Sequence, residues 1–231
     1  MRINKYIAKS GYCSRRKADN LIEKGQVKVN GKVLDKPGYE VYEGDLVSIN
    51  GEILKLEEFF YYKLNKPIGY ITSNFDPHNP KDLNDLIDLD RKFFAAGRLD
   101  KDSHGLLIIT NDGEFANALT HPSNGISKEY IVKVDKRLSA EKIKKFESGL
   151  DIGNGEITSR SQIFYKGNNT YKVIISQGYN RQIRRMFKVL GLNVIDLERI
   201  RIGKVHLDNL KSSNYQKFSK KELEFVDLIK G

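Results

Sequence analysis

The chain has 231 residues, and 39% of them are hydrophobic, which is enough for a substantial core in one large or two modest domains. Its formal net charge of +10 favours association with polyanions, and nucleic acid is the first candidate. A single cysteine excludes an internal disulfide, and the sequence shows neither a signal-peptide stretch nor the roughly 20 apolar residues that cross a bilayer, so we expect a cytoplasmic protein without a membrane partner.

The first residues carry two helical faces separated by Gly11. Ile3, Tyr6 and Ile7 share one face. The second face consists of Ala18, Leu21 and Ile22. Ser14 is placed to cap the second helix, and three cations, Arg15, Arg16 and Lys17, follow in its first turn. Cations are unfavourable at the positive end of a helix, so this pattern favours an external anion over a merely solvated turn.

Short strands follow these helices. VKVNGKV, residues 27–33, alternates around an Asn-Gly pair and predicts a hairpin, and another alternating strand covers 45–49. Residues 52–58 are charged and short, and we interpret them as a linker.

RINKYIAKSGYCSRRKADNLIEKGQVKVNGK resembles an S4 domain, a small RNA-binding module. The resemblance predicts an RNA-binding domain over residues 1–56, with the Arg15–Arg16 pair against RNA phosphates. The RNA contacts expected in this domain are Arg2, Lys5, Ser14, Arg15, Arg16 and Lys17.

Residues 59–231 mix strand and helix patterns. YYKLNKPIGYITS, GLLIITND and KEYIVKV predict strands, as does 171–176, while helices are expected from about 114, over 139–150, and from about 181 to 191. The order is not strictly alternating, so the sequence predicts an α+β domain with a mixed, mostly antiparallel sheet.

Several chemistries lack support in the sequence. The four histidines are scattered, which makes a zinc site improbable, and no phosphate-binding glycine loop or dinucleotide fingerprint is present. Ser103 and His104 are adjacent, but neighbouring residues of a strand or turn usually face different ways, which argues against a serine nucleophile. We therefore expect a reaction without a metal or an organic cofactor.

Asp100 lies at the entrance to the apolar segment 106–109, where burial would raise the pKa of its carboxyl unless a cation held it ionised. Cations occur in NRQIRRMFKVLG, where an apolar stripe of Ile183, Met186, Phe187 and Leu190 predicts an amphipathic helix with arginines on its other faces. Arginine is suited to pairing with a carboxylate or with phosphate in a half-buried setting.

KLNKPIG, GRLDKDSHGLLIITNDG, KEY and GYNRQIRRMF, in this order, resemble the successive motifs of RsuA-type pseudouridine synthases, which commonly carry an S4 domain first. CSRRKAD, GRLDKDS, NRQIRRM and LERIRIGKVHL are most similar to members acting on the large ribosomal subunit. The resemblance implies a pseudouridine synthase fold over residues 59–231.

The family pattern implies a role for each matching residue. Asp100 is the expected catalytic acid, Arg184 its partner, Tyr130 the ring that stacks under the target uracil, and Leu197 an aliphatic neighbour of that ring. Arg98 is expected to help displace the target nucleotide or to hold its phosphate. The full set of RNA contacts expected in this domain is Lys66, Arg98, Lys101, Lys128, Asn180, Arg181, Gln182 and Arg185.

The implied reaction is site-specific isomerisation of uridine to pseudouridine in ribosomal RNA, with 23S rRNA as the first candidate. Two alternatives remain open: the same reaction on 16S rRNA or a tRNA, and a non-catalytic S4-containing ribosome assembly factor. We expect a monomer, and Asp100 could act either as nucleophile or as base.

Overall fold

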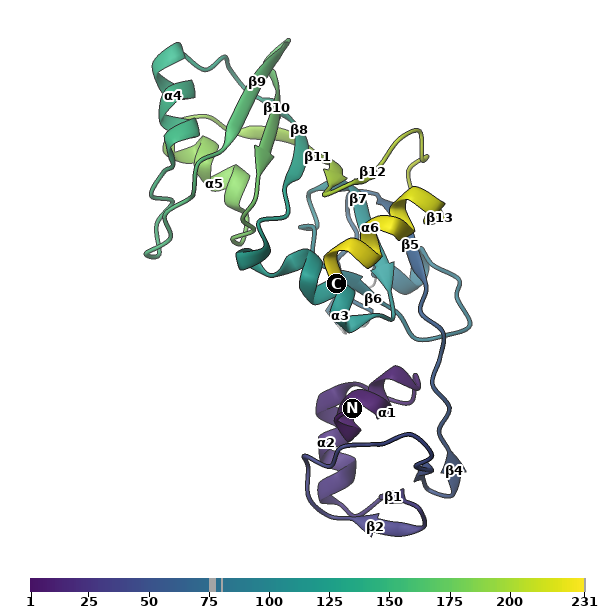
Figure 1. Ribbon diagram of the computed structural model, residues 1–231. Helices are drawn as coiled ribbons and strands as arrows, with labels where there is room; N and C mark the ends of the chain where they lie inside the picture. Colours follow the sequence, from purple (N-terminus) through teal and green to yellow (C-terminus); the bar gives the residue numbers. More distant parts are fainter. Residues whose placement is uncertain (75–77, 80, 231) are drawn as a thin grey trace. The chain divides into compact units, whose positions relative to one another are not determined.

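The computed structural model describes residues 1–74, 78–79 and 81–230. The chain forms two compact units, one of residues 1–60 with 90–92 and the other of residues 61–89 with 93–231. Figure 1 shows the ribbon with most helices and strands labelled.

The first unit begins with two short helices, α1 (Ile3–Lys9) and α2 (Arg15–Glu23). The Ser14 side chain accepts a hydrogen bond from the Lys17 amide, so it caps α2 as predicted. The apolar faces of both helices enter one core, which also contains Cys13, and burial raises the pKa of that thiol.

A small antiparallel sheet completes this unit. Its order is β2 (Lys32–Leu34), β1 (Val27–Val29), β3 (Val47–Ile49) and β4 (Glu52–Ile53). Two Asn-Gly pairs, 30–31 and 50–51, have positive φ at both residues, the geometry of a tight hairpin turn. The interpretation of residues 52–58 as a linker is therefore wrong at its start, because the second turn folds β4 back onto β3.

The second unit is built on a nine-stranded sheet. Its main order is β13-β5-β7-β11-β8-β10-β9, with β12 beside β11 and β6 beside β7. The bounds are β5 (Tyr61–Lys66), β6 (Phe94–Ala96), β7 (His104–Thr110), β8 (Lys128–Val134), β9 (Gln162–Gly167), β10 (Thr170–Ile175), β11 (Val194–Ile202), β12 (Val205–His206) and β13 (Tyr215–Lys217). Only the β7–β11 pair is parallel among the described strands, so the predicted mixed, mostly antiparallel α+β fold is confirmed.

Helices pack against this sheet in two groups (Figure 1). The group beside β8 and β10 contains α4 (Ala140–Ser148) and α5 (Gln182–Val189), and the group beside β7 contains α3 (Gly113–Thr120) and α6 (Lys220–Lys230). Two 3-10 turns, η1 (Leu83–Asp85) and η2 (Pro122–Asn124), lie in the connections. The predicted stripe of α5 is buried in the first group's core.

Gly105 is what allows β7 and β11 to lie so close. Its φ is +99°, and a Cβ there would fall 2.4 Å from the backbone oxygen of Arg199. Only glycine combines this backbone conformation with such a close approach. The register of the two strands, Glu198 with His104 and Arg199 with Gly105, therefore depends on this position.

Candidate active site

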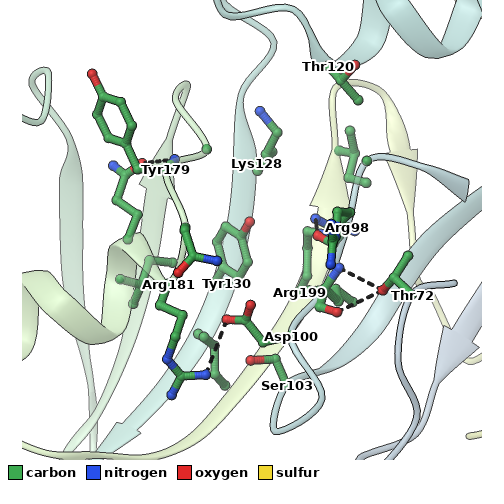
Figure 2. A pocket seen from close by; sticks show the side chains of 18 of the residues that line it. Thr72, Arg98, Asp100, Ser103, Thr120, Lys128, Tyr130, Tyr179, Arg181 and Arg199 are labelled. Carbon is green, nitrogen blue, oxygen red and sulfur yellow. Dashed lines mark hydrogen bonds and ion pairs between the residues drawn. The ribbon is translucent and has the colours of Figure 1, made fainter. Parts of the chain in front are cut away.

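A pocket of about 570 Å³ opens in the second unit, beside the loop that precedes β7 (Figure 2). Strands β8, β10 and β11 and the start of α5 supply much of its lining, and β6, α3 and the segment at Thr72 supply further residues. The sequence-predicted residues that line it are Arg98, Asp100, Lys101, Lys128, Tyr130, Asn180, Arg181, Gln182, Leu197.

Asp100 lies in a loop that is held by hydrogen bonds to its backbone. The Thr72 hydroxyl donates to the carbonyl oxygen of Leu99 at 2.7 Å and accepts from the Leu99 amide at 3.0 Å (Figure 2). The Ser103 amide donates to the carbonyl of Asp100 and closes the turn. The Asp100 side chain is 30% exposed, so its carboxylate is partly enclosed yet open to a ligand in the pocket.

The expected pairing of Asp100 with Arg184 is wrong in this structure. The Asp100 carboxylate lies 3.8 Å from Nη1 of Arg181, while Nε of Arg184 lies 3.3 Å from the carboxylate of Asp102. Arg184 also donates from Nη2 to the Asp102 carbonyl at 2.7 Å. Arg184 lies on the first turn of α5 and reaches the base of the loop, whereas Arg181, in the left-handed conformation before the helix, reaches the carboxylates themselves.

Asp102 therefore holds the two arginines together. It accepts from Nη1 and Nη2 of Arg181 at 2.9 and 2.8 Å, a bidentate geometry. The hydrogen bonds from Arg181 lower the pKa of Asp102. Burial opposes this effect and the charge of Arg184 adds to it, so the pKa stays below its usual value. Burial lowers the pKa of Arg184. The sequence reasoning missed Asp102, although its position two residues after Asp100 within one turn was a usable signal.

Tyr130 and Leu197 lie on adjacent antiparallel strands and both line the pocket. Each is less than one-tenth exposed, and both belong to the core that packs under α5. A planar aromatic face is thus available at the pocket wall opposite the loop of Asp100 (Figure 2).

Four of the predicted RNA contacts in this unit are exposed residues that line the pocket: Arg98, Lys101, Asn180 and Arg181. Lys128 lines it as well but is partly buried, and its Nζ donates to the carbonyls of Ile126 and Ser176. Burial, together with the positive charge of Arg199, lowers the pKa of Lys128.

The side chains of three other predicted RNA contacts form hydrogen bonds inside the protein. Lys66 is fully buried, and its Nζ donates to the carbonyls of Pro67 at 3.0 Å and Tyr70 at 2.7 Å. Gln182 is also buried and accepts from the Tyr179 amide at 3.0 Å. The prediction of an RNA contact is therefore wrong for Lys66, whose ammonium group donates to backbone carbonyls away from solvent. For Gln182, which lines the pocket, it stays a prediction.

Arg185 is the third of these residues. Its guanidinium forms an ion pair with Glu156 and donates to the carbonyls of Ile152, Gly153 and Asn180. It lies outside the pocket lining and joins a neighbouring loop to α5, so its RNA contact stays a prediction.

In the first unit, the side chains of Arg2, Ser14, Arg15, Arg16 and Lys17 are exposed, and that of Lys5 is partly exposed. Ser14 uses its hydroxyl oxygen as the cap of α2. The cations of the helix start thus lie at the surface, beside the amide groups of the first turn.

Arg199 is a pocket residue that the sequence reasoning missed. It is 3% exposed, and its guanidinium donates from Nε to the Leu106 carbonyl at 2.8 Å and from Nη1 to the Arg98 carbonyl at 3.2 Å. The signal was present, because strand alternation places Arg199 on the same face as the buried Leu197.

The described residues were also compared with the requirements of a metal site and of a membrane-spanning helix. No cluster of three or more histidine, cysteine or acidic side chains suited to a metal ion occurs among them. None of the helices in the described ranges has the length and apolar character that a bilayer crossing requires.

Comparisons with known proteins agree with this architecture. A family model for RNA pseudouridylate synthases matches residues 61–188, and one for the S4 domain matches residues 1–47. An RNA pseudouridine synthase of Aquifex aeolicus is 37% identical over all of this chain and 98% of its own length. The dual-specificity RNA pseudouridine synthase RluF of Escherichia coli is 37% identical over 100% of this chain and 79% of its own.

Two more matches cover nearly the whole chain. The ribosomal large subunit pseudouridine synthase B of Bacillus subtilis is 36% identical over 96% of this chain and 94% of its own. A crystal structure of a pseudouridylate synthase superimposes with a TM-score of 0.73 and 28% identity, covering 98% of this chain and 99% of the other. The chain therefore belongs to the RNA pseudouridylate synthase family, with an S4 domain ahead of the synthase domain.

Proposed function

We propose that this enzyme isomerises a specific uridine of 23S rRNA to pseudouridine, with residues 1–56 binding RNA and residues 59–231 carrying the reaction. The family membership supports the reaction class. The name of the Bacillus relative, a large-subunit synthase, supports the choice of RNA. One observation carries the assignment of the site: a carboxylate, an aromatic ring and several cations line a single pocket.

Asp100 is the proposed catalytic residue. The bond between N1 of uracil and C1′ of ribose breaks, the base turns in the pocket, and C5 joins C1′. A carboxylate contributes either as nucleophile at C1′ or as the base that removes the 2′ proton, and both routes require its ionised form. The guanidinium of Arg181 lies 3.8 Å from this carboxylate.

The target nucleotide must leave its stack to reach this pocket, at a cost of a few kcal/mol. Stacking on Tyr130, supported from beside by Leu197, offsets about 1–3 kcal/mol of that cost. The exposed cations Arg98, Lys101 and Arg181 bind the displaced backbone at the rim. The motif implied that Arg184 pairs with Asp100. We assign it instead the task of holding the Asp100 loop through Asp102 and Ser103.

The reaction is an isomerisation in which the proton lost from C5 is balanced by one gained at N1, so the proposed chemistry needs no cofactor. We infer that the enzyme acts as a monomer. The single cysteine agrees with a reducing compartment, and we infer that the enzyme acts in the cytoplasm.

The test is to map pseudouridine in 23S rRNA, 16S rRNA and tRNA from cells with and without the gene. Loss of one 23S rRNA site, restored by the wild-type gene, is the expected result. Loss confined to 16S rRNA or tRNA would contradict the choice of substrate. An unchanged map in all three RNAs, with no activity of the purified protein, would favour a non-catalytic assembly factor.

A further inference from the structure

Arg199 is a buried cation at the base of the pocket that pairs with no carboxylate among the described residues. Its Nε and Nη1 bond to backbone carbonyls, and its Nη2 is buried with no hydrogen-bond partner in the described part of the chain. A buried charge without a counter-charge, and a buried donor without an acceptor, are both costly. Such a group at a pocket wall indicates a ligand that supplies what is missing.

The surroundings of Arg199 are positive. Lys66 and Lys128 lie close enough that the charge of Arg199 contributes, after burial, to lowering the pKa of each. Both lysines donate to carbonyls rather than to carboxylates. Asp100 is the carboxylate of the pocket lining, so this part of the site favours a second negative charge.

The position of Arg199 indicates which part of the substrate it meets. Arg199 lies directly opposite Tyr130 in the antiparallel β8–β11 ladder, where paired side chains stand about 5 Å apart. The guanidinium turns from there towards β7 and the Arg98 carbonyl, and both residues line the pocket, so a base stacked on Tyr130 would share the pocket with it (Figure 2). RNA phosphates are better matched to the exposed cations at the rim, such as Arg98 and Lys101.

We propose that Arg199 is a catalytic residue that stabilises the departing uracil anion through its free Nη2 group and its charge. This inference rests on the proposed function. When the N1–C1′ bond breaks, its electron pair remains with uracil, and the negative charge spreads over the ring nitrogens and the carbonyl oxygens. At C1′ the lost bond is replaced by an ester bond to Asp100 or compensated by loss of the 2′ proton to it. That change is reversed when an electron pair of the ring forms the C5–C1′ bond, after which the C5 proton leaves and N1 gains a proton.

The geometry suits such a task because the guanidinium is already fixed. Two hydrogen bonds to strand and loop carbonyls hold it in place, so no reorganisation is needed when charge develops. The same contacts join β7, β11 and the carbonyl of Arg98, two residues before Asp100. Uracil is neutral before the bond breaks, so the interaction strengthens in the transition state and raises the rate rather than the affinity.

The test compares Arg199→Met with the wild type in single-turnover reactions at saturating RNA that carries the target uridine. Loss of a fixed donor and its charge should slow the reaction by about a hundredfold. RNA affinity should stay close to that of the wild type. A raised dissociation constant with an unchanged rate would overturn the proposal and assign Arg199 to phosphate binding.

A second substrate separates catalysis from a purely structural effect. In RNA with 5-fluorouridine at the target, fluorine withdraws electrons and stabilises the uracil anion, so Arg199 should matter less. The ratio of wild-type to Arg199→Met rates, measured as loss of the N1-linked nucleoside, should be smaller than with uridine. A displaced loop would slow both substrates equally, and equal ratios would overturn the proposal.

Control variants complete the design. Arg201→Met removes an arginine from the same strand whose guanidinium bonds to Glu129, Ser127 and Gly203 outside this pocket, and it should keep the wild-type rate. If Arg199→Met does not fold, as judged by circular dichroism, Arg199→Lys should show the same smaller ratio with 5-fluorouridine. A wild-type protein that forms no pseudouridine would contradict the proposed function itself, whereas normal turnover with equal ratios contradicts only this inference.

Discussion

Burial of the Lys66 ammonium group should make the free energy of unfolding depend on pH, and replacing Lys66 with methionine should remove that dependence. Burial lowers the pKa of Lys66 from 10.5 to about 8, with the charge of Asp100 opposing the change and that of Arg199 adding to it. The side chain is 0% exposed, so solvent screening is weak. A change of this size corresponds to about 3 kcal/mol between the charged and neutral forms.

The sign follows from proton binding. Folding disfavours the charged form, so between pH 8 and 10.5 the unfolded chain binds more protons at this position than the folded chain does. The free energy of unfolding therefore rises with pH across this window. The methionine variant lacks this contribution, and it also leaves the carbonyls of Pro67 and Tyr70 without their donor.

Urea unfolding followed by circular dichroism from pH 7 to 10.5 measures the effect. The stability difference between wild type and Lys66→Met should grow in favour of the wild type by up to about 3 kcal/mol as the pH rises. Lys188→Met, which removes an exposed lysine of α5, controls for the loss of one charge. A wild-type to Lys66→Met difference that stays constant over this range would refute the reasoning.

Two further variants test the strand packing at Gly105 and the RNA contacts of the first unit. Gly105→Ala places a methyl group 2.4 Å from the Arg199 backbone oxygen at a positive φ, so it should lower the free energy of unfolding by about 3 kcal/mol or more, measured by thermal unfolding. Gly113→Ala, with open space around it, should not have this effect, and equal stabilities of the two variants would contradict the close-approach argument. Arg15→Glu combined with Arg16→Glu should weaken binding to full-length rRNA at moderate salt while slow modification of a short stem-loop persists, and Lys220→Glu with Lys221→Glu on α6 is the matched charge change. Unchanged rRNA affinity in the Arg15/Arg16 variant would show that the RNA contacts of the first unit are misplaced.

Local features of this fold are legible in the sequence. The Ser14 cap, the first Asn-Gly hairpin and the apolar stripe of α5 each depend on residues close together in the sequence, and the structure has all three. The second Asn-Gly pair carried the same signal as the first, and treating the following residues as a linker overlooked it.

The site was harder to predict, because motif matches locate residues without giving their side-chain directions. Arg184 was expected at Asp100, yet its side chain reaches Asp102 and Ser103 instead. Lys66 was expected to contact RNA, whereas its ammonium group donates to the carbonyls of Pro67 and Tyr70 inside the protein. The role of Arg199 depends on the β7–β11 pairing of strands about ninety residues apart, which no local pattern specifies.

The most direct test of the account is pseudouridine formation by Asp100→Asn on the rRNA that the wild type modifies. Asparagine keeps the shape of the side chain and removes its charge, so we predict normal RNA binding with no detectable product. Wild-type turnover in this variant would contradict the claim that the carboxylate of Asp100 performs the reaction.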